Sequence, residues 1–409
     1  MPTASTCVGT SEVSYTKTQK AQKTARTDVA RTAFKFVLII GIVNLFADLT
    51  YEGGRSITGP FLESLGASAI VVGVVAGGGE LLGYSLRSIA GYVADKTEKY
   101  WVVIFVGYVV NMLAIPALAL AGNWPLASVL MIAERTGRGI RKPAVDAMLS
   151  YAGKSIGHGW VFGLNEGLDQ AGATLGPLVV ALVLYLRYGY REGFAVLLIS
   201  ALLCLGTLVL ARTWHPEPHK LEAQSDLSET TGFSKRYWIY VVAGALIAVG
   251  FADFSLIAFH FKKATHISDT TIPLFYAAAM AAGALTNLVL GRLFDRVGIA
   301  VAMFAFLAGA CFAPFVFAGQ YWLILTGMLL WGIGMGAQNS LLKAMLAAVM
   351  PANKRSTGFG LFYTAFGVAW FLGSATMGFL YYKSIPALII FSVVFQLAAL
   401  PVFWWGRTR

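Results

Sequence analysis

One face of the apolar segment 35–58 carries four polar side chains. Asn44, Asp48, Glu52 and Arg55 follow the spacing i, i+4, i+8, i+11, which places them on one narrow side of a helix. If this helix crosses a bilayer, a charge at its centre costs about 2.5 to 3.5 kcal/mol, so the face must point into the protein. A carboxyl group in dry surroundings can hold a proton near neutral pH and release it when a cation approaches. The predicted chemistry is proton loading and release, with Asp48 and Glu52 as the first candidates.

Later apolar segments also contain acidic residues. Segment 159–185 contains Asn165, Glu166 and Asp169, and segment 237–260 contains Asp253. We expect Asp169 and Asp253 to be the second candidates for proton coupling. The alternative for each acid is a static internal ion pair, such as Asp48 or Glu52 with Arg135.

Segment 125–148 is unusually basic. Glu134, Arg138 and Arg141 share one helical face, and Arg135 and Lys142 lie on the adjoining one. Arginine forms paired hydrogen bonds with carboxylate and phosphate groups. An anionic substrate bound by Arg135 and Arg138 is therefore an alternative. Because Pro143 and Asp146 follow at once, we expect Arg141 and Lys142 to lie at the cytoplasmic end of the helix.

Two further polar positions have simple expectations. Glu80, Tyr84 and Arg87 share one face of segment 66–90, and we expect Glu80 to pair with Arg87. Lys343, the approximate counterpart of Lys142, is expected to extend to the cytoplasm.

Polar and aromatic side chains from several segments are candidates for lining a substrate cavity. Their aromatic members would suit an amphipathic organic molecule, although packing and interface anchoring are the alternative for Trp331 and Trp370. The complete set is Asn44, Glu80, Arg135, Arg138, Asn165, Trp331, Gln338, Asn339, Tyr363 and Trp370.

The composition indicates what positions these residues. Of 409 residues, 57% are hydrophobic and 12% charged, and the mean hydropathy is +0.68, which is typical of a membrane protein. A bilayer-spanning helix needs about 20 apolar residues. Twelve such segments are predicted, at 35–58, 66–90, 101–121, 125–148, 159–185, 193–211, 237–260, 271–291, 299–319, 322–347, 357–381 and 385–405. Ten or eleven spans would require weaker segments, such as 159–185, to lie outside the lipid.

The polar stretches divide the chain. Residues 1–34 form a predicted cytoplasmic tail without the pattern of a signal peptide, and residues 212–236 form a predicted linker between six-helix bundles at 35–211 and 237–409. Cys7, Cys204 and Cys311 are far apart, so we expect no disulfide framework, metal site or cofactor.

The basic residues predict the orientation. With both termini cytoplasmic, the outer segments hold only Arg55, Arg187, Arg191, Lys262, Lys263 and Lys383. The net charge of +11 is then explained by anionic lipid at the inner leaflet of the plasma membrane, and a nucleic-acid partner is unnecessary.

The two halves of the chain repeat one another. Gly91 and Asp95 recur 200 residues later as Gly291 and Asp295, the run Phe-Ala-Asp at 46–48 recurs at 251–253, and Phe-Gly-Leu at 162–164 recurs at 359–361. Parallel six-span repeats are typical of transporter halves related by a two-fold axis, with the substrate between them.

The first repeat predicts a contact that can form and break. A glycine allows close helix approach, and an aspartate four residues later can accept hydrogen bonds from the first amides of a neighbouring helix. We expect a conformational latch in each half, and the alternative is simple charge placement at a membrane surface. The latch residues are Gly91, Asp95, Lys96, Lys99, Gly291, Asp295 and Arg296.

Three stretches of the sequence resemble motifs of one protein family, and the resemblance covers residues 35 to 405. Gly91, Asp95, Lys96 and Lys99 fit the loop signature G-x-x-x-D-[RK]-x-x-[RK] of the major facilitator superfamily, with Glu98 where glycine is usual. Arg135, Arg138 and Gly139 resemble the R-x-x-x-G motif of its proton-coupled members. Gly172, Gly176 and Pro177 resemble the helix-packing motif G-x-x-x-G-P-x-x-G-G of its proton-driven exporters, with Val180 and Ala181 replacing the last glycines. The run GRGIRKPAVDAML also resembles a prokaryotic branch of the superfamily, with Val145 replacing an arginine.

The resemblance implies an all-α membrane protein of 12 transmembrane helices in two pseudo-symmetric six-helix bundles, working as a monomer. It implies a secondary active transporter that moves a small-molecule substrate by alternating access, with proton-coupled export ahead of uptake of a nutrient or organic anion. The other hypotheses are a non-transporting sensor and a membrane-embedded enzyme. The enzyme would need a nucleophile with a base or a metal set, and none of the five histidines lies beside such partners.

Overall fold

The computed structural model describes residues 9–67, 69–217, 232–252, 254, 256–257, 260–261, 271–317 and 319–407. For residues 9–28 and some others within helices it describes the backbone alone. The candidate Asp253 and most of the predicted linker, 218–231, lie outside these residues.

The described residues are almost entirely helical and contain no strand. The first six helices are α1 (Gly9–Ser64), α2 (Ala69–Thr97), α3 (Tyr100–Ala117) with the short η1 (Leu118–Leu120), α4 (Trp124–Ile156), α5 (His158–Tyr185) and α6 (Tyr190–Trp214). The second half contains α7 (Lys235–Gly250), α9 (Thr271–Val297), α10 (Ile299–Ala310), α11 (Phe312–Val316), α12 (Tyr321–Asn339), α13 (Leu341–Val349), η3 (Ala352–Lys354), α14 (Arg355–Lys383) and α15 (Ile385–Arg407).

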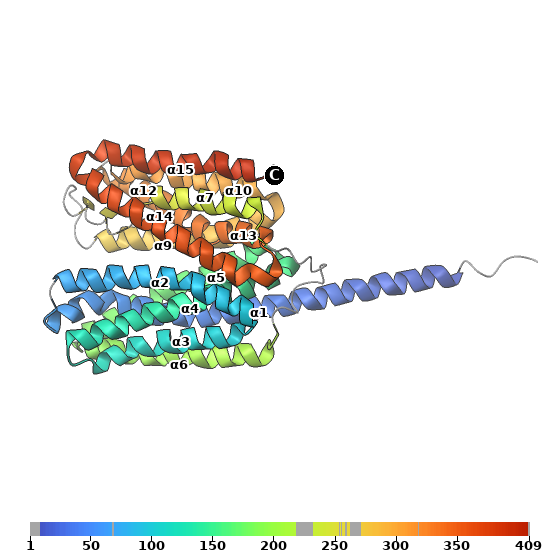
Figure 1. Ribbon diagram of the computed structural model, residues 1–409, viewed down its shortest axis with the longest axis horizontal. Helices are drawn as coiled ribbons and strands as arrows, with labels where there is room; N and C mark the ends of the chain where they lie inside the picture. Colours follow the sequence, from blue (N-terminus) through green and yellow to red (C-terminus); the bar gives the residue numbers. More distant parts are fainter. Residues whose placement is uncertain are drawn as a thin grey trace, which may run out of the picture.

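Each of the twelve predicted segments overlaps one of these helices or a consecutive pair of them, although 237–260 extends past the end of α7 at Gly250. Three crossings are interrupted, where α3 passes into η1, α10 into α11, and α12 into α13 at Ser340. Figure 1 shows α1 to α6 in one bundle and α7 to α15 in the other. The predicted fold class is confirmed.

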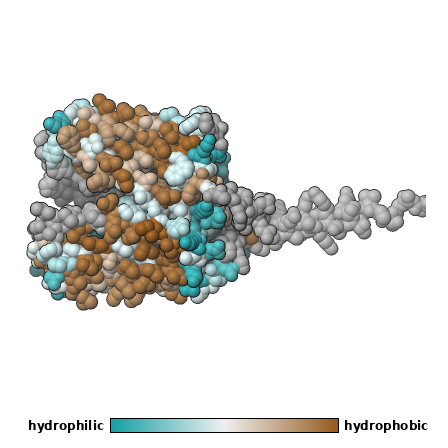
Figure 2. Space-filling model, in the orientation of Figure 1, coloured by the Kyte–Doolittle hydropathy of each residue, from teal (hydrophilic) through white to brown (hydrophobic). Residues whose placement is uncertain are grey.

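By length and apolar composition alone, seven helices of the described chain are long enough to cross a membrane. They cover Val29–Thr58, Tyr100–Leu120, His158–Tyr185, Tyr190–Trp214, Ile299–Val316, Ala352–Lys383 and Ile385–Gly406. Figure 2 shows hydrophobic side chains on the visible face of both bundles and hydrophilic ones at the end from which α1 projects. This arrangement matches a protein whose sides face acyl chains.

The alternative that 159–185 lies outside the lipid does not fit the packing of α5. A Cβ at Gly172 or Gly176 would press on the backbone of α1, at the carbonyl oxygens of Leu45 and Leu49 respectively. The half-buried Pro177 follows within the same helix. The glycines of the predicted helix-packing motif therefore hold α5 directly against α1, inside the first bundle.

The sequence repeat is visible as crossed packing between the bundles. Gly163 on α5 lies against the Asn287 carbonyl on α9, and its counterpart Gly360 on α14 lies against the Arg87 carbonyl on α2. The counterparts Phe162 and Phe359 touch each other, with ring centroids 5.8 Å apart. Equivalent residues can meet in this way only near an axis that relates the two halves.

The predicted tail at 1–34 is described from Gly9 onward. Helix α1 begins at Gly9 and runs without interruption into the first span. Residues 10–40 contain neither glycine nor proline, so no residue breaks the helix there. The predicted tail and span are therefore one helix from Gly9 onward.

Candidate functional site

The polar face of α1 becomes steadily more exposed toward one end of the bundle. Asn44 is 1% exposed, and the side chains of Asp48, Glu52 and Arg55 are 24%, 28% and 54% exposed. This end of the bundle lies opposite the C-terminal ends of α2 and α9. We call this face, formed by Asn44, Asp48, Glu52 and Arg55, the polar seam. Asn44 is closed to solvent, and solvent reaches the seam at Arg55.

The prediction that Glu80 pairs with Arg87 is wrong. Glu80 instead accepts hydrogen bonds from Arg135 and from Arg138, whose Nη2 lies 3.0 Å from Oε1 and 3.2 Å from Oε2. Arg87 is sandwiched between aromatic rings, with its guanidinium 4.2 Å from the centroid of Tyr84 and 4.5 Å from that of Tyr363. Two arginines thus share one partly exposed glutamate.

The alternative pairing of Asp48 or Glu52 with Arg135 is also not seen in this structure. Glu52 pairs with Arg55 of its own helix at 3.5 Å, and Asp48 lies 3.9 Å from Arg141. The Glu52 pair lies at the exposed end of the seam, where solvent stabilises both charges. Asp48 thus lies near a buried arginine, and Glu52 pairs with an exposed one.

Arg141 occupies the sealed end of the seam and not the predicted end of its helix. It is only 2% exposed, because α4 continues through Pro143 as far as Ile156. Its Nη1 donates to Asn44 Oδ1 at 3.2 Å, and Asn44 in turn donates to Asn165 Oδ1 at 2.8 Å. Tyr108 completes the group by donating to Asn44 and lying under the Arg141 guanidinium at 4.2 Å.

A half-buried lysine and a buried lysine meet two acids of α5. Lys142 Nζ lies 3.5 Å from Asp169 Oδ2, and Lys343 Nζ lies 3.1 Å from Glu166 Oε2. The prediction that Lys343 extends to the cytoplasm is wrong, since it is 4% exposed. Lys142 comes from the first bundle and Lys343 from the second, so only the second pair joins the two halves. Burial makes such pairs costly to break on one side.

A second polar contact joins the halves next to these lysines. Tyr363 on α14 donates its hydroxyl hydrogen to Asp146 Oδ2 on α4. Both residues are buried. The predicted cavity residue Tyr363 therefore holds the two bundles together in this arrangement.

The facing part of the second bundle is aromatic. Trp331 is 1% exposed, stacks on Phe251 with centroids 5.5 Å apart, and donates from Nε1 to the Ala252 carbonyl at 2.9 Å. Trp370 is half-buried and lies 5.7 Å from the Phe251 ring. Trp331 is thus a packing residue, as the alternative for it proposed, while Trp370 keeps some exposed surface.

The two predicted amides of α12 lie near its end. Gln338 is buried and donates to the carbonyl of Gly334 within its own helix at 3.2 Å. Asn339 is half-buried and is the last residue before the break at Ser340. Neither amide contacts the charged network in the described residues.

Both predicted aspartates accept backbone amides from the opposite bundle. Asp95, on α2, accepts from Ser356 N at 3.2 Å and Thr357 N at 2.6 Å, at the start of α14. Asp295, on α9, accepts from Gly159 N at 2.8 Å and Trp160 N at 2.7 Å, at the start of α5. We call these contacts the Asp95 latch and the Asp295 latch.

The glycines and the basic residues of the latches behave differently. A Cβ at Gly91 would strike the Ser356 carbonyl, and one at Gly291 would lie 2.5 Å from the Gly159 carbonyl oxygen. The side chains of Lys96, Lys99 and Arg296 are exposed and, in the described part of the chain, make none of the latch hydrogen bonds. Glycine is thus needed for the approach, and the basic residues lie around it.

Glu98 explains why the family pattern favours glycine in this loop. Its φ angle is 54°, in the left-handed region that side chains other than glycine adopt at a cost. The loop therefore adopts a conformation that favours glycine, although Glu98 occupies this position.

Each latch is held by a balance of opposing terms. Burial raises the pKa of Asp95, and hydrogen bonds from the side chains of Thr357 and Tyr100 and from the amides of Thr357 and Ser356 lower it. Burial likewise raises the pKa of Asp295, and the amides of Trp160 and Gly159 lower it. Desolvation of the carboxylate offsets much of what the amides contribute. A contact in which burial and hydrogen bonding oppose each other in this way is suited to repeated opening and closing.

Replacing either latch aspartate with asparagine should open that latch. Each carboxylate oxygen accepts one amide, whereas the asparagine NH₂ group would face an amide donor. We expect Asp95→Asn to reduce the latched population roughly tenfold or more. The measurement is the distance between spin labels at the exposed Thr97 and Asn353, in a background without cysteines.

The matched control for this experiment is Lys96→Gln. Lys96 lies over the Tyr92 ring at 5.6 Å and outside the hydrogen bonds of the latch. The label distance should remain that of the parent protein. An unchanged distance distribution in Asp95→Asn would contradict the role of this contact.

Several residues of the network are missing from the predicted site. They are Arg141, Lys142, Lys343, Glu166, Asp146 and Tyr108. Two signals were present: Lys142 and Lys343 recur in corresponding places of the halves, and Glu166 and Asp169 are spaced i, i+3 on one helical face. Both indicate a layer of charge at equal depth in the two bundles.

Comparisons with known proteins agree with this architecture. A family model described as Major Facilitator Superfamily matches residues 40–300 and 240–409. An uncharacterised protein of Mycobacterium tuberculosis (strain ATCC 25618 / H37Rv) is 35% identical over 378 residues, which cover 91% of this chain and 92% of the relative. An uncharacterised MFS-type transporter of Methanocaldococcus jannaschii is 25% identical over 89% of this chain and 92% of its own length. The class B tetracycline resistance protein of Escherichia coli is 27% identical over 53% of each chain.

Solved structures resemble the fold at low sequence identity. A bacterial homologue of the iron transporter ferroportin, in an outward-facing state, has a TM-score of 0.73 and 14% identity over 91% of this chain and all of its own, 100%. The human organic anion transporter MFSD10 has a TM-score of 0.74 and 12% identity, covering 91% of this chain and 99% of its own. These identities support the fold alone.

Proposed function

We propose a function for this chain from the premise that it belongs to the major facilitator superfamily. It is a multi-pass membrane protein of that fold, and its family and structural neighbours are transporters. Our proposal is a secondary active transporter of the plasma membrane that exports a small organic solute in exchange for protons. The observation that carries it is the crossed pair of latches together with the Lys343–Glu166 pair, all of which join the two halves.

The proposed motion is a rocking of the two bundles. Two latches close one end of the molecule, and the polar seam of α1 is exposed toward the other. With both termini cytoplasmic, the latched end is the cytoplasmic one and the exposed seam faces outward. The inward-facing state would require both latches and the Lys343–Glu166 pair to separate.

Proton exchange would occur in the charged network of the first bundle. In the outward-facing state, protons would reach Asp48 through the exposed seam and then Asp169, where protonation would weaken the ion pair with Lys142. In the inward-facing state, a solute competes for the protonated acids and releases their protons to the cytoplasm. The solute and the protons thus never need to occupy the network together, which is the condition for exchange.

The solute class follows from the different character of the two bundles. The first offers paired charges, and the second offers the half-buried Trp370 ring, which lies against the buried Phe251. An amphipathic molecule with one polar end and one apolar end would match both. The partial likeness to a tetracycline resistance protein is consistent with export of such a compound.

Uptake of an organic anion is the second candidate. It is favoured by the fork of Arg135 and Arg138 on the partly exposed Glu80, which an incoming carboxylate could displace. A non-transporting sensor on the same fold would show no solute-dependent proton movement.

The deciding experiment has two stages. Purified protein is first screened with amphipathic compounds and organic anions for a rise in melting temperature. Binding solutes are then tested in proteoliposomes with an imposed pH gradient of either sign. Export by exchange predicts that solute moves in the direction opposite to the proton flow. Solute movement in the same direction as the protons would instead support uptake. Binding without any solute or proton movement would refute a transport function.

A further inference from the structure

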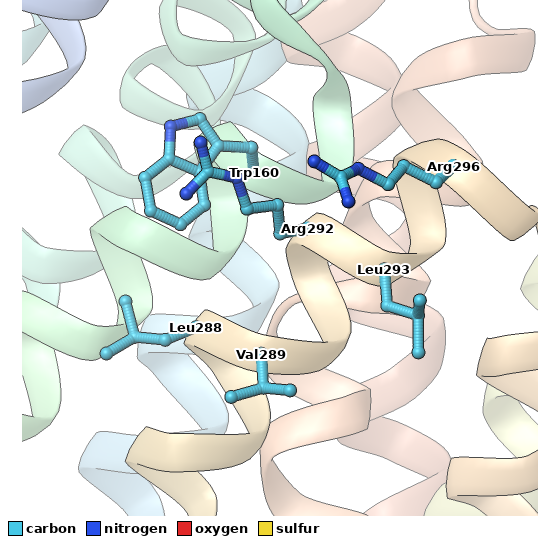
Figure 3. Close-up of a pocket in the computed structure, with 6 residues that line it drawn as sticks. All are labelled: Trp160, Leu288, Val289, Arg292, Leu293 and Arg296. Carbon is cyan, nitrogen blue, oxygen red and sulfur yellow. The ribbon is translucent and has the colours of Figure 1, made fainter.

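A groove at the latched end combines two arginines, a tryptophan and an aliphatic floor. It has a volume of about 440 Å³ and is lined by Trp160 on α5 and by Leu288, Val289, Arg292, Leu293 and Arg296 on α9. Figure 3 shows the two guanidinium groups and the indole at one end of the groove and the aliphatic side chains toward the other. We call it the Arg292 groove.

The charged end of the groove is open to a ligand. Arg292 lies 4.6 Å from the Trp160 ring centroid, and Arg296 is one helical turn farther along α9. Both arginines are exposed, and among the described residues neither makes an ion pair with a carboxylate. Asp295, the acid between them, directs both oxygens at the amides of α5. Two positive charges therefore face outward without an internal counter-charge.

The other end of the groove faces the apolar side of the molecule. Val289 is 60% exposed and Leu293 is 40% exposed. They lie on the same helical face as the arginines, which end the helix at the polar boundary. The groove is thus apolar where acyl chains would run and cationic where headgroups would lie, with a tryptophan at the level typical of the membrane interface.

We propose that the Arg292 groove binds an anionic phospholipid of the leaflet at the latched end. The phosphate would accept hydrogen bonds from the Arg292 and Arg296 forks, and one acyl chain would lie along Leu288, Val289 and Leu293. Charge complementarity selects the headgroup, and continuity with the apolar belt selects a lipid over a free anion.

The position of the groove links this lipid to the Asp295 latch. Trp160 belongs to the first bundle and Arg292 to the second, so a bound lipid touches both halves. The backbone amide of Trp160 is itself one of the two donors to Asp295. Binding at the groove thus favours the latched state, because separation of α5 from α9 would divide the site. This regulatory consequence rests on the proposed function, whereas lipid binding itself does not.

The corresponding surface of the first bundle lacks the same features. The counterparts of Arg292 and Arg296 are Tyr92 and Lys96, and Thr357 stands where the other half has Trp160. The lipid site is thus predicted on one side of the pseudo-symmetric molecule only. The Asp95 latch provides a control surface of the same geometry.

The test measures lipid retention by native mass spectrometry on the full chain. Protein is exchanged into mixed micelles that contain phosphatidylglycerol and phosphatidylcholine, and the retained lipid is titrated. Because each basic residue at an anionic surface strengthens attraction, Arg292→Gln with Arg296→Gln should weaken phosphatidylglycerol retention roughly thirtyfold. Lys96→Gln with Lys99→Gln removes the same charge at the control surface and should change retention by less than about twofold.

Two further arms identify the ligand as a lipid. Val289→Glu keeps both arginines and puts a negative charge in the acyl path, so it should weaken retention as well. Inorganic phosphate at equal concentration should not displace the lipid. Equal loss in both arginine and lysine variants, or displacement by phosphate alone, would overturn the site. Retention is measured without solute, so a failed transport assay would not affect this result.

Discussion

Replacing Asp169 with asparagine is expected to reduce pH-driven solute movement to the level of protein-free vesicles. Asparagine cannot ionise, so no proton can be taken up or released at this position. Asp169 is buried, its Oδ2 lies 3.5 Å from Lys142, and Oδ1 has no hydrogen-bond partner among the described residues. Lys142 is the ion-pair partner of this carboxylate among the described residues, so a proton on Asp169 competes with that pair. The measurement is flux in proteoliposomes with an imposed pH gradient.

Downhill exchange distinguishes loss of coupling from loss of the protein. Asp169→Asn should still exchange labelled solute in the absence of a gradient, because the latches and the seam are intact. Glu52→Gln is the matched control, since Glu52 is half-buried and paired with the exposed Arg55 within its own helix. It should retain pH-driven flux within about threefold of the parent protein. If both Asp48→Asn and Asp169→Asn retain that flux, protons do not couple through this network.

The latches show what the sequence could predict at the level of single contacts. A glycine four residues before an aspartate, written twice at the same distance from a span, indicates close approach and a carboxylate at a helix start. Local spacing determines the chemistry of the contact, but it does not indicate which helix supplies the amides. The Asp95 and Asp295 hydrogen bonds in the structure follow this pattern.

The buried charges could not be placed from spacing in the same way. A lysine near a helix end can extend to water or pair inward, and the outcome for Lys343 depends on Glu166, which is 177 residues away in the chain. For Arg141, a proline two residues later suggested a helix end, but the backbone continues through Pro143. Periodicity gives the face of a helix, while the depth and the partner of a charge depend on the neighbouring helix.

Removing one member of the Lys343–Glu166 pair should destabilise the protein strongly. Lys343→Met leaves a buried carboxylate without its cation, and Glu166→Gln leaves a buried ammonium without its anion. Each loss should cost about 3 to 5 kcal/mol of unfolding free energy, unless the remaining group changes its protonation. The charge-reversed double variant, Lys343→Glu with Glu166→Lys, should recover much of that loss. The measurement is chemical unfolding in detergent, analysed as a double-mutant cycle.

Breaking the Lys343–Glu166 pair should also change the conformation, whereas removing the equivalent lysine, Lys142, should not. Lys343 and Glu166 belong to different bundles, whereas Lys142 and Asp169 belong to the same one. Breaking the first pair should therefore lengthen the label distance between Thr97 and Asn353, and Lys142→Met should lower stability without lengthening it. The comparison separates a charge that holds the halves together from one that only holds a bundle together. If Lys142→Met and Lys343→Met shift the label distance equally, buried charge acts on overall packing, and the Lys343–Glu166 pair is not a contact that rocking must break.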